Sequence, residues 1–196
     1  MKLAIASIVL STTTSTRLPR QINSATDRRY KQLTSMMNFH NPEFDERKYW
    51  TYGCNCLILG KFLDWETSLN FIGDRPMSDP GHGKPVDALD SVCKAYKDCL
   101  KCARKTYGDE CIGEFVKYRY GLRQDEIVCR DDPNSCKRAL CECDAMFAQQ
   151  HVAAKDVFDT QYHMFWAEQD GHKYWDPTEP EKCQTSGLLA LFGSLC

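Results

Sequence analysis

Residues 81–100 read GHGKPVDALDSVCKAYKDCL and join a turn to the start of a long helix. Glycine and proline in residues 81–85 disfavour regular structure before the helical segment begins. The apolar residues then recur at intervals of three and four, the spacing of one helix face. They are Leu89, Val92, Cys93, Tyr96, Leu100 and Ala103. Since Cys93 and Cys99 lie in this segment, we expect a buried helix that disulfides attach to its surroundings.

The cysteine content indicates the class of protein. The chain has 196 residues, 42% of them hydrophobic, and twelve cysteines. This length can bury a substantial core without an obvious division into repeats, so we expect one main domain. Many cysteines in a short chain predict disulfides formed in an oxidising compartment. One-residue gaps, as in Cys54-x-Cys56 and Cys141-x-Cys143, are shorter than zinc ligands usually show. We therefore expect disulfides and no metal site.

The N-terminus predicts secretion. Met1-Lys2 precedes an apolar run from Leu3 to Leu10 and then small polar residues, as in a secretory signal. The dibasic Arg28-Arg29 marks either a clipped pro-segment or scattered arginines in a leader. We assign 1–29 to a signal peptide, with or without a pro-segment, and expect an extracellular protein. No later apolar run is long enough for a transmembrane segment.

The charge of the remaining chain excludes some partners. Residues 30–196 contain 20 basic and 26 acidic residues, a formal net charge of −6. We therefore expect no nucleic acid partner, and no anionic membrane bound through overall charge. The long helix nevertheless has a basic stripe, which is either a solvated face or a docking surface for an anion. Its residues are Lys94, Lys97, Lys101, Arg104 and Lys105.

Two motifs give the chain a family resemblance. Tyr52-Gly53-Cys54-Asn55-Cys56 lies upstream of the segment from Asp87 to Cys99. Together they resemble the secreted phospholipase A2 family, whose signature is Tyr-Gly-Cys-x-Cys-Gly followed by Asp-x-Leu-Asp-x-Cys-Cys-x-x-His-Asp-x-Cys. The resemblance implies a mainly α, disulfide-rich fold with two long antiparallel helices and a small β-wing. It extends over roughly Tyr30 to Val152, and we assign 30–196 to one phospholipase A2-like domain.

Each element of that fold has a counterpart in this sequence. Residues 30–39 match the first helix, and residues 132–136 open the second long helix with turn and cap residues. The β-wing matches Tyr118-x-Tyr120 and Asp125 to Cys129. The family expects a short glycine-rich calcium loop after Cys56, but a longer loop, 57–80, is inserted here. Because long unstructured loops are uncommon, we expect this insertion to fold against the body. A C-terminal extension, 153–196, is particular to this chain.

The family's disulfides can be carried over position by position. They imply Cys56–Cys93, Cys99–Cys143, Cys111–Cys136 and Cys129–Cys141, with Cys54 bonded to a tail cysteine. Cys102 would then pair with the remaining one of Cys183 and Cys196. Two family bridges are missing as whole pairs, because their four positions carry Val92 with Gln150 and Phe39 with Leu122.

The resemblance also assigns the catalytic positions. In the family a helical His is the general base, and the following Asp binds the calcium that stabilises the oxyanion. These positions carry Tyr96 and Lys97 here. A phenol, with an unperturbed pKa of about 10, is a poor base at neutral pH, and a lysine repels calcium. We therefore expect no catalytic residues, no calcium cofactor and no enzymatic activity.

Two further family positions are retained. Asp144 matches the carboxylate that orients the catalytic His, and Tyr118 matches a tyrosine that bonds it. We expect Tyr96 to donate a hydrogen bond to Asp144, because a buried carboxylate needs partners. The five histidines lie in unrelated contexts, and we interpret them as surface or turn residues. They are His40, His82, His151, His163 and His172.

The sequence thus predicts a secreted binding or structural protein on a phospholipase A2 scaffold. Family precedent offers protein-binding subunits, mineral-matrix proteins related to otoconins, and membrane-damaging toxins, though the acidic body disfavours the last. A non-hydrolytic lipid binder would use an apolar channel lined by Tyr30, Leu33 and Met36, which are otherwise ordinary core residues. The competing class is an atypical active phospholipase A2 that hydrolyses sn-2 esters of glycerophospholipids.

Overall fold

The computed structural model describes residues 29–49, 51–56, 83–112, 116–177, 179 and 181–183. The expected signal peptide, apart from its last residue, lies outside this part of the chain. The expected inserted loop, 57–80, lies outside it as well.

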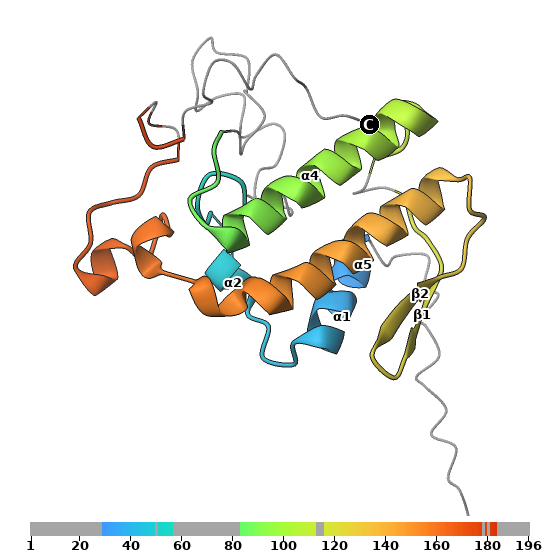
Figure 1. The fold of residues 1–196 in the computed structure, drawn as a ribbon, viewed down its shortest axis with the longest axis horizontal. Helices are drawn as coiled ribbons and strands as arrows, with labels where there is room; N and C mark the ends of the chain where they lie inside the picture. The colour runs from blue at the N-terminus through green and yellow to red at the C-terminus, as the bar shows by residue number, and fades with distance from the viewer. Residues whose placement is uncertain are drawn as a thin grey trace, which may run out of the picture.

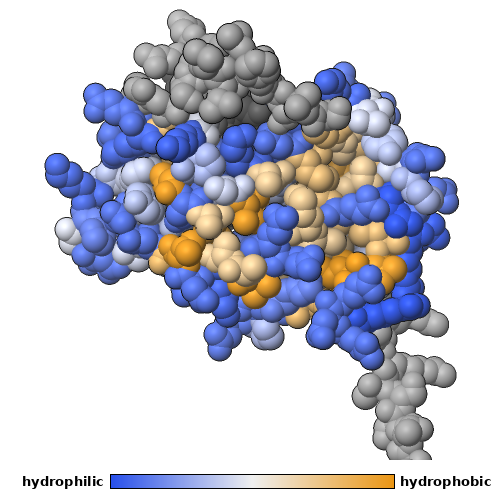
Figure 2. Space-filling view, in the orientation of Figure 1, coloured by the Kyte–Doolittle hydropathy of each residue, from blue (hydrophilic) through white to orange (hydrophobic). Residues whose placement is uncertain are grey.

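Two long antiparallel helices form the centre of the molecule (Figure 1). They are α4 (Ala88–Tyr107) and α5 (Cys136–Ala154). The Asp87 carboxylate caps α4 by accepting the Asp90 N–H, and the Ser135 hydroxyl caps α5 by accepting the Arg138 N–H. Figure 2 shows apolar atoms gathered where the two helices meet, with hydrophilic side chains around them. The predicted mainly α, disulfide-rich fold is confirmed.

Among the described residues, two shorter helices precede the long pair. Helix α1 (Arg29–His40) packs against α5 and is slightly longer than the predicted 30–39. Its residues Leu33, Met36 and Met37 are buried in the core. Helix α2 (Glu46–Tyr49) is a single turn that buries Tyr49. No described helix is long and apolar enough to cross a membrane.

The β-wing is a two-stranded antiparallel sheet of β1 (Tyr120–Arg123) and β2 (Glu126–Cys129). Its register pairs Tyr120 with Cys129 and Arg123 with Glu126. The sequence predicted that the wing begins at Tyr118, which is wrong by two residues. The backbone of Tyr118 instead bonds the Gln32 side chain of α1, because its carbonyl accepts Gln32 Nε2–H at 2.7 Å.

Five disulfides join described residues. Four are the pairs that the family resemblance implied: Cys56–Cys93, Cys99–Cys143, Cys111–Cys136 and Cys129–Cys141. The fifth pairs Cys54 with the tail cysteine Cys183. Cys102 is also disulfide-bonded. Cys196, the other tail cysteine expected to form a disulfide, lies outside the described residues.

The C-terminal extension packs against the Tyr-Gly-Cys segment. Its described residues contain three short 3₁₀ turns, η1 (Lys155–Val157), η2 (Thr160–Tyr162) and η3 (Glu168–Asp170). His163 forms an isolated antiparallel bridge with Tyr52, and the Phe158 ring stacks on the Tyr52 ring with centroids 5.0 Å apart. The extension therefore belongs to the same packed body as the motif that it covers.

Candidate functional site

A buried cluster of three polar side chains lies between the two long helices. Tyr96 Oη donates to Asp144 Oδ1 at 2.7 Å, and Tyr118 Oη donates to Asp144 Oδ2 at 2.5 Å. Asp144 has no exposed surface, while Tyr96 and Tyr118 are 6% and 3% exposed. The structure therefore shows the hydrogen bond expected between Tyr96 and Asp144. We refer to these three residues as the tyrosine–aspartate cluster.

Separate elements position the members of this cluster. Tyr96 comes from α4 and Asp144 from α5, and their helices are tied by Cys99–Cys143 one turn away. The Tyr96 ring stacks on Phe147 of α5, with centroids 4.4 Å apart and planes inclined by 26°. Because both oxygens of Asp144 have a phenolic donor, burial of the carboxylate is offset by hydrogen bonds.

Helix α1 reaches the same cluster. The Sδ atom of Met36 lies 3.9 Å from the Tyr118 hydroxyl, and Gln32 holds the Tyr118 backbone. Leu33 and Met36, both expected to line an apolar channel, are core residues with 5% and 0% exposure. The side chain of Tyr30, the third expected residue, lies outside the described part. The structure thus places the apolar face of α1 directly against the polar cluster.

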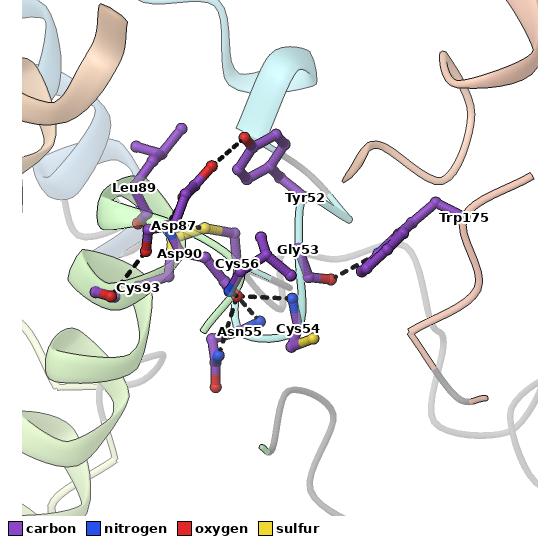
Figure 3. The surroundings of a disulfide bond; sticks show 12 residues. Tyr52, Gly53, Cys54, Asn55, Cys56, Asp87, Leu89, Asp90, Cys93 and Trp175 are labelled. Atoms are coloured by element: carbon purple, nitrogen blue, oxygen red, sulfur yellow. Dashed lines mark hydrogen bonds between the residues drawn. A yellow bond between two sulfur atoms is a disulfide. The ribbon is translucent and has the colours of Figure 1, made fainter. Parts of the chain in front are cut away.

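A second carboxylate, Asp90, is surrounded by hydrogen-bond donors from the Tyr-Gly-Cys segment (Figure 3). It is fully buried and accepts the backbone N–H groups of Cys54 at 2.9 Å, Asn55 at 2.6 Å and Val86 at 3.0 Å. Gly53 approaches it closely, with φ +59°, and a Cβ there would lie 2.5 Å from Asp90 Cγ. Asp90 therefore holds this segment against the start of α4. Sequence reasoning missed this role, although Asp87-x-x-Asp90 at a helix start was its signal.

Tyr52 and Trp175 connect the C-terminal extension to the Tyr-Gly-Cys segment and the start of α4. Tyr52 Oη donates to Asp87 Oδ2 and accepts the N–H of Asp159, while Trp175 Nε1–H donates to the Gly53 carbonyl at 3.1 Å. Burial, and then the hydrogen bond to Asp87, raise the pKa of Tyr52 well above its ordinary value. Tyr52 is thus a neutral phenol that links α4 to the extension.

The residues on α4 do not fit calcium, the metal that the family resemblance implies. Lys97 occupies the position of the family's carboxylate ligand, and the neighbouring Asp98 pairs with Lys94 Nζ at 2.9 Å. Across the described ranges, no three acidic, histidine or cysteine side chains gather as a metal site requires. The expected calcium loop lies within 57–80, outside the described residues.

Two of the histidines are not at the surface, so their interpretation as surface or turn residues is wrong. His151 and His163 are 0% and 1% exposed. His163 is satisfied by hydrogen bonds, because Nε2 contacts the Arg47 carbonyl at 3.0 Å and Nδ1 accepts the Phe165 and Trp166 N–H groups. Both are buried because helix α5 and the extension pack against α2, which a linear sequence does not show.

Comparisons with known proteins identify the family. The family model described as Phospholipase A2 matches residues 78–163, which include all of α4, α5 and the β-wing. The chain is 30% identical over 155 residues to "Acidic phospholipase A2 VP7" of Daboia palaestinae, covering 78% of this chain and 86% of that protein. This chain belongs to the phospholipase A2 family. It is also 31% identical over 136 residues to an "Acidic phospholipase A2" of Bothrops jararaca, covering 69% and 90% of the two chains.

A mammalian relative has the same kind of name. The chain is 26% identical over 134 residues to "Phospholipase A2, membrane associated" of Mus musculus, covering 68% of this chain and 75% of that protein. These names contradict the expectation that this chain is not an enzyme, because its family is one of enzymes. That expectation was based on Tyr96, on Lys97 and on the insertion after Cys56, whereas the names of the relatives point to a family of enzymes. The narrower resemblance to otoconin-like proteins stays a prediction.

Proposed function

We propose that this phospholipase A2-family protein binds a glycerophospholipid where α1 meets the tyrosine–aspartate cluster. The names of its relatives point to phospholipids as the ligand class. The contact between Met36 and the Tyr118 hydroxyl supports this location, because it brings an apolar helix face and a polar cluster together. Since both side chains are buried, the lipid must displace α1 from the cluster to enter. A phospholipid has the same two parts, acyl chains and a polar headgroup.

The proposed setting is extracellular. Described residues alone contribute five disulfides, which persist in an oxidising compartment. The apolar N-terminal run is the sequence feature that supports secretion.

The proposed binding does not require calcium. Lys97 brings a positive charge to the position at which the family resemblance expects a calcium carboxylate, and Asp98 is already paired with Lys94. A hard dication prefers several oxygen ligands, so these side chains disfavour it.

The test is a calorimetric titration with a short-chain diether phosphatidylcholine, whose ether bonds resist ester hydrolysis. We expect saturable binding that is the same in calcium and in EDTA. Hydrogen exchange with and without this lipid then locates the site without a mutation. We expect slower exchange in α1, with the β2 strand as an internal control. No saturable binding, or protection confined to the β-wing, would contradict the proposal.

Ester hydrolysis is the second candidate function, and the names of the relatives favour it. A mechanism at this cluster would need a base other than the neutral phenol of Tyr96. The assay measures fatty acid released from ester phospholipid in mixed micelles, with calcium and with EDTA. Release in both media would support hydrolysis without calcium. Release only with calcium would support hydrolysis and contradict the proposed calcium independence.

A further inference from the structure

His151 is a buried ionisable group without a polar partner. It lies near the C-terminal end of α5 and has no exposed surface. Neither of its ring nitrogens has a hydrogen-bond partner within the described part of the chain. Buried polar groups are nearly always bonded, so such a group calls for an explanation.

Three aromatic rings surround His151. Its ring centroid lies 4.1 Å from that of Tyr49, 5.5 Å from Phe147 and 5.6 Å from Phe44. Tyr49 belongs to α2, Phe44 to the connector before it and Phe147 to α5. We call these three rings and His151 the aromatic box. The box is the place where the segment from Phe44 to Tyr49 packs onto α5.

The surroundings of the box favour a neutral imidazole. Tyr49 is the titratable group in ring contact with His151, and its own pKa is raised, chiefly by burial. The carboxylates that act on Tyr49 are Asp45, which pairs with Arg47, and Asp156 of η1. Burial lowers the pKa of His151 to about 4, and no carboxylate of the described residues contributes to this shift.

The aromatic box also touches the tyrosine–aspartate cluster. Phe147 contacts His151 on one side and stacks on Tyr96 on the other, 4.4 Å between centroids. Tyr96 in turn bonds Asp144. Because Phe147 contacts both His151 and Tyr96, a displacement of the aromatic box would change the packing of Tyr96.

We propose that His151 is an acid-sensitive element, whose protonation releases the segment from Phe44 to Tyr49 from α5 and loosens the packing of Tyr96. The inference stands on the packing of His151 and does not depend on which ligand the chain binds.

The direction of the pH effect follows from the two states of the imidazole. An unfolded or released His151 takes up a proton near pH 6.5, whereas the packed imidazole does so only near pH 4. Packing is therefore fully stable above pH 6.5 and is weakened as the pH falls from 6.5 to 4. Between pH 7.5 and pH 5, this one group should raise the unfolding equilibrium constant about 30-fold.

The test compares urea unfolding of the wild-type chain and the His151→Phe variant at pH 7.5 and pH 5, with disulfides intact. Phenylalanine keeps an aromatic ring and removes the titratable nitrogens. From pH 7.5 to pH 5, we expect the unfolding equilibrium constant of the wild type to rise about 30-fold more than that of the variant. We also expect the protection factors of backbone amides in residues 44–49 of the wild type, corrected for the pH dependence of intrinsic exchange, to fall at pH 5. Equal pH dependence in the two proteins would overturn the proposal.

His163→Phe is the matched control. His163 is equally buried, and burial lowers its pKa as well, but its hydrogen bond to Arg47 opposes that shift. This variant should therefore lose stability at both pH values and lose less of the pH dependence than His151→Phe. If His151→Phe does not fold, an NMR titration of the wild-type His151 ring decides the question. A titration midpoint below pH 5 is expected, and a midpoint near 6.5 would overturn the proposal.

Discussion

Removing one hydroxyl from the tyrosine–aspartate cluster should weaken the whole fold. Tyr96→Phe keeps the ring that stacks on Phe147 but deletes the donor to Asp144 Oδ1. The Tyr118 hydroxyl still bonds the other oxygen. A hydrogen bond to a carboxylate contributes about 1.5 to 3 kcal/mol, and Asp144 is too buried to recover it from water.

For a domain of this size, 1 kcal/mol corresponds to a change in melting temperature of about 2 to 4 °C. We therefore expect Tyr96→Phe to melt about 3 to 12 °C lower, by circular dichroism with disulfides intact. Tyr107→Phe is the control, because Tyr107 lies on the same helix but is 38% exposed. That variant should change stability by less than about 0.5 kcal/mol. Equal melting temperatures for the two variants would refute the view that Tyr96 satisfies Asp144.

Other predictions concern the segment around Asp90. Asp90→Asn should leave at least one backbone N–H unpaired, at about 1 to 3 kcal/mol, which urea unfolding would measure. Gly53→Ala should lower the melting temperature more than Gly108→Ala. A Cβ at Gly53 would lie 2.5 Å from Asp90 Cγ, whereas a Cβ at Gly108 would have no neighbouring atom within 4 Å among the described residues. Trp175→Phe should cost about 0.5 to 1.5 kcal/mol and speed exchange of the Gly53 region, since it removes the indole N–H.

The long helices could be predicted from the sequence because local rules define them. Helical spacing after the turn at residues 81–85 predicts α4, and the turn before Cys136 predicts α5. The cysteine pairs were accessible only through the family resemblance, because spacing alone does not assign connectivity. The family pattern implied that Cys54 bonds a tail cysteine, and the structure was needed to identify that cysteine as Cys183.

The buried polar groups were harder to predict. His151 lies seven residues after Asp144, on the same helix face as Phe147, so the periodicity contained a signal that was not used. His163 offered no such signal, because its burial depends on the extension folding onto α2. Asp90 bonds backbone groups of a segment more than thirty residues earlier, so the Asp87-x-x-Asp90 pattern marks a helix start but does not identify these partners.

The enzymatic prediction was wrong for a different reason. Two positions on α4 and the insertion after Cys56 were weighed more heavily than the family as a whole, whose members are named phospholipases A2. The chemistry of Tyr96 and Lys97 predicts how these positions behave, but it does not decide the activity of the protein.

Calcium binding is the most direct test of the proposed function. The measurement is isothermal calorimetry of calcium into the oxidised full chain, with and without the diether phosphatidylcholine. We expect no saturable calcium heat in either case, while the lipid binds with the same affinity throughout. A single calcium site that forms with the lipid, or lipid binding that disappears in EDTA, would contradict calcium-independent binding at the tyrosine–aspartate cluster.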